Sequence, residues 1–482
     1  MEPWPRVFVL LAVTAAVLCT PLVNDLEPGK EWPPRNSVKQ PLDEVNEPAK
    51  LQAIPEEETA TGDPINDNLD IPEPEAQILT KTAFDDKVDY TGAQVWKVET
   101  NKNSIWLTIM RLRRRNLIST WAGNHSYVDV FIKPNAIENV TRVFQRENIS
   151  YEVVIDDLQK RINEENPPLD ENDIELQDRQ GHRMTWKQYH RLSDIHDFMD
   201  YLAKTYPAIV SVKTIGHSYE GRDLKVLRIS NGNPTNKAVF IDGGIHAREW
   251  ISPATVTYFI NQFAENFDVE SDDIKNIDWY FLPVVNPDGY EYTHVGDRLW
   301  RKNRKPGVLG RNCIGTDLNR NFGYRWGGKG ASSNPCSDIF RGSRAFSEPE
   351  SRAVSEFISS SAAKFSAYLT YHSYGQYLLY PWGYDNALPP DHRDLDVVGK
   401  NIAQAIRQAG GTTYQVGSSS GLLYPASGGS DDWAKGQGIK YTYTIELRDT
   451  GRYGFVLPTT QIIPVAQESL AGLRVLAKQL HA

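Results

Sequence analysis

Residues 185–482 alternate between two patterns of apolar and polar positions. Near-continuous apolar runs bounded by turn-forming residues predict strands, and longer segments with helical spacing predict helices. The expected strands are Leu224–Ile229, Lys237–Asp242, Asp278–Val285, Phe365–His372 and Tyr441–Leu447. The expected helices are Ile195–Lys204, Pro253–Phe267, Glu348–Ala362, Asp394–Ala409 and Pro464–Leu480. Because strands of this kind are buried on both faces, the pattern predicts one α/β domain with a mixed, largely parallel twisted sheet and helices on both faces.

A shorter alternation of the same kind occupies residues 81–160 and predicts a separate small α/β unit. Its expected strands are Gln94–Val98, Tyr127–Ile132 and Tyr151–Ile155. Its expected helices are Asn103–Arg113 and Ile137–Arg146.

Two polar segments flank this unit. Residues 21–80 are rich in Pro, Asp, Glu and Asn, which predicts a flexible acidic spacer or an interaction tail. Residues 161–184 contain an acidic run with isolated basic residues at Arg179 and Arg183. They predict a flexible connection that is either a site of proteolytic cleavage or a plain linker between domains.

The start of the chain predicts a secreted protein. Residues 1–20 contain an apolar run, Val7–Leu18, that is too short to span a bilayer and is typical of a signal peptide. No later segment is apolar enough to cross a membrane. The net charge of −10 argues against nucleic acid as a partner. We expect an extracellular monomer.

Cysteines and glycosylation motifs agree with this location. Cys19 lies in or beside the signal, so Cys313 and Cys336 remain to form a disulfide in an oxidising compartment or to stay as two buried thiols. Three Asn-x-Ser/Thr motifs are acceptors for glycans if the chain is secreted. They lie at Asn124, Asn139 and Asn148.

Potential metal ligands lie at the ends of three expected strands. His246 and Glu249 follow one strand, His372 ends a second and Glu446 ends a third. Carboxyl ends of parallel strands meet at one edge of a sheet, where ligands bind, and two His with one Glu are the ligands of one class of catalytic zinc site. Taken singly, each residue has another interpretation, as a loop histidine, a helix N-terminal acid or a buried core histidine.

Arginine and glycine-rich stretches suggest a pocket for a carboxylate. Asn319-Arg320 and the arginines on either side of Trp300 can hold a carboxylate through paired hydrogen bonds, or can pair with nearby acids. The stretch 427–432 contains two glycines and ends in Asp431-Asp432, which predicts a pocket wall, a turn or a helix start.

Residues 185–482 resemble the zinc metallocarboxypeptidases of the pancreatic A/B type over the whole domain. The matching stretches are His246–Trp250, Asn286–Gly289, Arg298–Lys302, Asp317–Asn321, His372–Tyr374, Tyr424 with Gly428–Ser430, and Ile445–Gly454. The resemblance implies a zymogen that hydrolyses the C-terminal bond of peptides and proteins with one Zn²⁺. It also implies that residues 81–160 form an open-sandwich inhibitory activation domain, removed by a trypsin-like protease at Arg179 or Arg183.

The resemblance also implies a role for each site residue. It makes His246, Glu249 and His372 the zinc ligands, Glu446 the general base and Arg301 the group that steadies the oxyanion. It assigns binding of the substrate carboxylate to Asn319, Arg320 and Tyr424. It also implies that the neighbouring subsites are lined by Arg248, Ser373, Tyr374 and Phe455. Cys313 and Cys336 match the disulfide of the family.

Substrate preference depends on Asp431. Asp at this pocket position is typical of B-type enzymes and favours C-terminal Lys or Arg, whereas A-type enzymes have an apolar residue there. Ser419 matches neither type and Gly383 matches the A-type, so an A-type preference is the alternative. An inactive binding relative is a further alternative, although the ligands and Glu446 are all present. The processing-type branch, which typically lacks the activation domain and adds a β-sandwich, does not match this chain.

Overall fold

The computed structural model describes residues 87–307 and 313–481. The expected signal peptide (1–20) and acidic spacer (21–80) lie outside these residues. Among the described residues, no helix combines the length and the apolar character that a membrane crossing requires.

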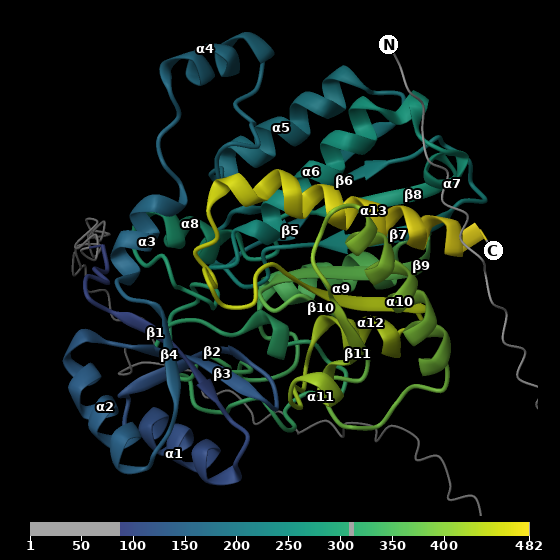
Figure 1. Cartoon of the computed structure of the whole chain (residues 1–482). Helices are drawn as coiled ribbons and strands as arrows, with labels where there is room; N and C mark the ends of the chain where they lie inside the picture. The colour runs from purple at the N-terminus through teal and green to yellow at the C-terminus, as the bar shows by residue number, and fades with distance from the viewer. Residues whose placement is uncertain (1–86, 308–312, 482) are drawn as a thin grey trace, which may run out of the picture. The chain divides into compact units, whose positions relative to one another are not determined.

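An eight-stranded mixed sheet forms the centre of the larger part (Figure 1). Its strand order is β11-β10-β12-β9-β7-β8-β6-β5. The bounds are β5 Val210–His217, β6 Asp223–Ile229, β7 Lys237–Asp242, β8 Ile277–Leu282, β9 Lys364–Ser373, β10 Tyr377–Tyr380, β11 Gln415–Ser418 and β12 Tyr441–Leu447. The four central strands β12, β9, β7 and β8 are parallel, whereas β10 pairs antiparallel with β12, and β6 pairs antiparallel with β8 and β5. The expected mixed, largely parallel sheet is therefore confirmed.

Helices cover both faces of this sheet because its strands are apolar on both. On β7, Val239 and Ile241 join the core under one group of helices, and Phe240 joins the core on the opposite face. The first group is α5 Leu192–Thr205, α6 Ile251–Glu265, α10 His392–Gln408 and α13 Ile462–His481. The second is α9 Pro349–Ser360 and α12 Ser430–Gly436. Shorter helices are α7 Asp272–Lys275, α8 Pro287–Val295 and α11 Ser419–Leu422.

The smaller unit is an open sandwich of one sheet and two helices. Its antiparallel strands have the order β2-β3-β1-β4, with β1 Gln94–Glu99, β2 Ile118–Gly123, β3 Tyr127–Ile132 and β4 Tyr151–Ile155. Helices α1 Asn103–Arg114 and α2 Ile137–Arg146 pack on one face. On the other face, Val95, Trp121 and Phe131 share a core with Tyr374 and Phe455 of the larger domain.

The segment 161–184 is more ordered than its composition suggests. We expected a flexible connection, but α3 Leu158–Glu165 and α4 Glu171–Gln180 occupy most of it. The carboxylate of Asp170 accepts the backbone N–H of Asp173 at 2.8 Å and begins α4, and Gly181, with φ of 76°, ends it. Local capping therefore makes a helix from residues with little apolar character.

Candidate active site

His246, Glu249 and His372 converge at the carboxyl ends of two adjacent strands. His246 and Glu249 lie in the turn between β7 and α6, and His372 is the penultimate residue of β9. Gly244 makes the sharp turn possible, because its φ is 62° and an added Cβ would lie 2.9 Å from Pro253. The parallel pairing of β7 with β9 then brings the two segments together.

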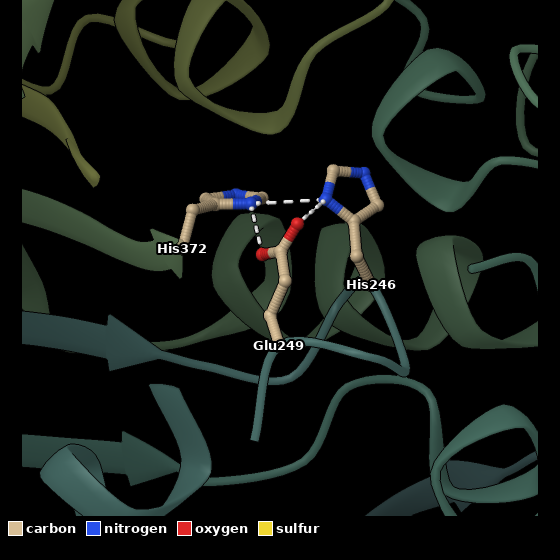
Figure 2. A group of neighbouring side chains, drawn as sticks. All are labelled: His246, Glu249 and His372. Atoms are coloured by element: carbon tan, nitrogen blue, oxygen red, sulfur yellow. Dashed lines mark hydrogen bonds and ion pairs between the residues drawn. The ribbon is translucent and has the colours of Figure 1, made fainter. Parts of the chain in front are cut away.

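The donor atoms of these three side chains form a compact buried group (Figure 2). Glu249 Oε1 lies 2.8 Å from His246 Nδ1, Glu249 Oε2 lies 3.1 Å from His372 Nδ1, and the two Nδ1 atoms are 3.2 Å apart. Each residue offers one ligand atom, these three atoms lie within 4.8 Å of one another, and none of the residues is more than 4% exposed. Two imidazoles and a carboxylate at this spacing fit one Zn²⁺.

Asp317 orients His246 from behind. Asp317 Oδ1 lies 3.1 Å from His246 Nε2, and Oδ2 accepts from Arg301 Nε at 3.1 Å and Nη2 at 2.8 Å. Burial by itself favours protonation of Asp317, but Arg301, His246 and Arg320 together outweigh it and hold the pKa of Asp317 well below its usual range. An ionised Asp317 can only accept, so His246 carries its proton on Nε2 and turns the Nδ1 lone pair towards Glu249.

Glu446 lies beside the metal group. It is the register partner of His372 on the adjacent strand β12 and lines the same cavity. Burial raises the pKa of Glu446 to about 7, although His372 partly opposes the shift. A carboxyl group with this pKa can take and return a proton near neutral pH.

The cavity beside the metal group has a volume of about 120 Å³. Arg320 and Asn319 lie on its wall, and Tyr424, 51% exposed, lies at its edge. Asn319 is fixed because its side-chain oxygen accepts the N–H of Ser430 at 2.9 Å. The guanidinium of Arg320 is fixed by the carbonyl oxygens of Asn319 and Gly330, at 2.8 and 2.9 Å.

Two adjacent carboxylates on α12 have different surroundings. Asp432 accepts the N–H groups of Gly383 and Tyr384, both at 2.8 Å, and so holds a wall of the cavity. Asp431 lines the cavity and is 6% exposed, and burial raises its pKa. Within the described part of the chain, no lysine or arginine forms an ion pair with Asp431. Ser419 and Gly383 line the same cavity.

The expected subsite residues lie next to the metal group, where the small unit also makes contact. The Arg248 guanidinium lies 4.0 Å from the Phe455 ring centroid, and the N–H of Ser373 donates to Glu249 at 3.1 Å. Tyr374 donates its hydroxyl to Asp129 of the small unit at 2.8 Å. Trp121, on β2, packs on Phe455 with ring centroids 5.0 Å apart. The sequence did not reveal these contacts, because the partners are far apart in the chain.

The remaining expected residues do not line the cavity. Cys313 and Cys336 form a disulfide with Cα atoms 4.7 Å apart. Arg179 lies in the last turn of α4, and Arg183 follows that helix. Asn139 and Asn148 are exposed on the small unit. Asn124 is half-buried and donates its side-chain N–H to the Tyr377 hydroxyl at 2.8 Å.

Comparison with known proteins agrees with this geometry. The zinc carboxypeptidase family model matches residues 195–472, and the carboxypeptidase activation peptide model matches residues 97–165. Carboxypeptidase B of Astacus astacus is 50% identical over 297 residues, which cover 61% of this chain and 97% of the relative. Carboxypeptidase A1 of Bos taurus is 38% identical over 395 residues, which cover 80% and 93%.

A solved structure extends the similarity to both parts of the chain. The crystal structure of thrombin activatable fibrinolysis inhibitor matches with a TM-score of 0.74 and 34% identity, covering 81% of this chain and 99% of that one. The sequence matches, the fold and the buried His₂Glu group agree. The chain belongs to the zinc carboxypeptidase family and carries its activation peptide.

Proposed function

We propose that this zinc carboxypeptidase removes C-terminal lysine and arginine residues. The observation that carries the proposal is the buried, cation-free carboxylate of Asp431 in the cavity wall. A buried carboxylate is unfavourable unless a cation or hydrogen bonds compensate it, and the hydrogen bonds from Thr444 and the Asp432 backbone do so only in part, since burial still raises the pKa of Asp431. The ammonium or guanidinium group of a bound substrate supplies that cation, whereas an apolar side chain does not. A relative named carboxypeptidase B supports the proposal, although A-type relatives are also similar.

The cavity also provides room for a long side chain. Gly383 and Ser419 are small residues on its wall, and Asp432 is already engaged with backbone N–H groups. Asp431 is therefore the carboxylate that remains for the substrate. Asn319, Arg320 and the exposed residue Tyr424 bind the substrate's terminal carboxylate, since Arg donors match its geometry.

The ligands and neighbouring charged groups divide the chemistry among them. His246, Glu249 and His372 would hold zinc, which would supply a Lewis acid for the scissile carbonyl. Glu446 takes a proton from the attacking water and delivers it to the departing nitrogen. Arg301 holds Asp317 through Nε and Nη2, and its Nη1 lies 4.0 Å from Glu249, so this nitrogen is placed to donate to the developing oxyanion.

The small unit inhibits by occupying the upstream subsites. Trp121 packs on Phe455, and Asp129 binds the hydroxyl of Tyr374. The substrate residues that precede the C-terminal residue would need the same surface of Tyr374 and Phe455. Removal of the activation peptide therefore opens the path along Arg248, Ser373, Tyr374 and Phe455.

We place the activating cleavage after Arg179 rather than Arg183. The residue after Arg183 is Met184, which is 5% exposed and belongs to the core of the catalytic domain. Arg179 lies at the end of α4, a ten-residue helix whose Ile174 is 47% exposed, and such a short helix unwinds easily. Trypsin treatment should release an enzyme that begins at Gln180. The substitution Arg179→Gln should slow activation and Arg183→Gln should not, and a first product beginning at Met184 would contradict this assignment.

Secretion is the location that best suits this chain. The disulfide between Cys313 and Cys336 agrees with an oxidising compartment. Asn139 and Asn148 are exposed, and we propose them as the glycan acceptors. Asn124 uses its side-chain nitrogen to bind Tyr377, so we propose that it carries no glycan.

The preference is tested by comparing kcat/KM for arginine-ended and phenylalanine-ended peptides after cleavage. The substitution Asp431→Asn removes the carboxylate that pairs with the substrate's arginine side chain. It should lower kcat/KM for arginine-ended peptides by about 10²-fold or more, since an unpaired buried charge costs about 3 kcal/mol or more. Asp385→Asn, at an exposed carboxylate paired with Lys329, is the matched control and should change neither value. An unchanged arginine preference in Asp431→Asn would refute the assignment, and a phenylalanine preference in the unaltered enzyme would establish the A-type alternative.

A further inference from the structure

His372 is held from its second ring nitrogen by a buried chain of hydrogen bonds. His372 Nε2 lies 3.2 Å from Thr370 Oγ1, and that hydroxyl donates to Asp242 Oδ1 at 2.7 Å. The other oxygen of Asp242 accepts the hydroxyl of Tyr368. Thr370, Asp242 and Tyr368 are completely buried, so water does not compete for these bonds.

The direction of each bond in this chain follows from its proton count. An ionised carboxylate has no proton to give, so the single hydroxyl proton of Thr370 goes to Asp242. The Thr370 oxygen can then only accept from His372, which places a proton on Nε2. A neutral imidazole with Nε2–H has its lone pair on Nδ1, the atom that lies 3.1 Å from Glu249 and 3.2 Å from His246 Nδ1.

We propose that Asp242 and Thr370 are positioning residues, which fix His372 in the tautomer that binds zinc. The inference rests on His372 being a zinc ligand. Asp242 is hydrogen-bonded to Thr370, which in turn contacts His372, whereas Asp317 contacts His246 directly. The two histidines thus reach the same tautomer by a direct and by a relayed contact.

The sheet register creates this relay. Asp242, the last residue of β7, is the register partner of Thr370 on β9. Thr370 and His372 are two residues apart on one strand, so their side chains lie on the same face. The last residue of one strand thereby supports a ligand carried by its neighbour.

The test measures the zinc dissociation constant of the full chain by competition with a chelator. Thr370→Val removes the hydroxyl at nearly constant shape, and Asp242→Asn removes the charge. Each should weaken zinc binding by about 10- to 100-fold, the range for loss of an outer-shell partner. Thr370→Ser keeps the hydroxyl and should restore most of the affinity. Thr442→Val is the matched control, because Thr442 is completely buried in adjacent strand β12 and its hydroxyl bonds to the Ile439 carbonyl.

A double-mutant cycle separates the relay from general damage. If Asp242 acts through Thr370, adding Asp242→Asn to Thr370→Val should cause no further loss of zinc affinity.

Two results would overturn the proposal. They are unchanged zinc affinity in Thr370→Val and an equal effect of Asp242→Asn in both backgrounds. The variant His372→Ala tests the assignment of His372 as a zinc ligand separately from the relay through Thr370. If it still binds zinc normally, the ligand assignment itself is wrong. If it loses zinc while Thr370→Val does not, only the relay is wrong.

Discussion

A buried ion pair joins the activation peptide to the catalytic domain. Glu165, at the end of α3, receives Arg298 Nε at 2.6 Å and also binds Nη2 of the same guanidinium. Their side chains are 1% and 2% exposed. Arg298 also donates to the carbonyl oxygens of Arg248 and Phe455, at 2.9 and 2.7 Å, so the pair lies against the proposed upstream subsites.

We predict that Glu165→Gln weakens the hold of the activation peptide by at least 100-fold. Burial raises the pKa of Glu165 despite Arg298, so forming the pair yields less free energy than its close contacts suggest. Breaking it is a different matter, because the variant leaves a buried guanidinium without its counter-charge, which costs about 3 to 5 kcal/mol. At about 1.4 kcal/mol for each tenfold change, this corresponds to roughly 10²- to 10⁴-fold in the dissociation constant.

The assay uses the full chain, cleaved by trypsin without separating the fragments. Serial dilution releases the activation peptide, and the concentration at which peptidase activity appears reports the dissociation constant. Glu164→Gln is the matched control, because Glu164 is half-exposed, pairs with Arg161 at 3.4 Å and should contribute at most about 1 kcal/mol. If Glu165→Gln and the unaltered chain show the same midpoint, the pair does not hold the peptide.

Three further predictions use the same contacts. Burial raises the pKa of Asp129 to about 6, outweighing the opposing effect of Lys97. Docking of the activation peptide should therefore be strongest well below pH 6 and weaken as the pH rises through 6. The dilution midpoint should be lower at pH 5 than at pH 7, and Asp129→Asn should reduce this difference. In a chain protected from cleavage by Arg179→Gln and Arg183→Gln, Trp121→Ala should raise peptide hydrolysis by removing the contact with Phe455, with an upper bound of about 3 to 5 kcal/mol on docking; no increase would show that Trp121 does not block the subsites. Mass spectrometry of the secreted chain should find glycans on Asn139 and Asn148 and an unmodified Asn124, and a glycan on Asn124 would contradict the proposed use of its amide.

Strong apolar patterns predicted the elements that build the catalytic edge. Strands β7 and β12 have the bounds expected from their sequences, and β9 extends one residue beyond expectation at each end. These strands are apolar on both faces and bounded by polar residues, so their pattern is unambiguous. The ligands lie at the end of such a strand or in the turn after it, which explains why the sequence could predict the metal group.

Weaker patterns were missed for physical reasons. Strands β10 and β11 have four residues each, too few to establish a period, and β5 lies at the sheet edge with several exposed positions. Helix α4 depends on its caps rather than on an apolar face. Contacts such as Asp242 with Thr370, or Trp121 with Phe455, join distant segments, so no local pattern indicates them.

The neighbouring acids Asp431 and Asp432 at the start of α12 separate substrate recognition from support of the cavity wall. Asp432 holds the backbone of Gly383 and Tyr384 in place, whereas Asp431 hydrogen-bonds to Thr444 and to the backbone at the start of α12. A substitution at Asp431 therefore changes the chemistry of the cavity while Asp432 keeps its hydrogen bonds to Gly383 and Tyr384. In evolutionary terms, selectivity can diverge at this position without giving up the contacts that hold this part of the wall.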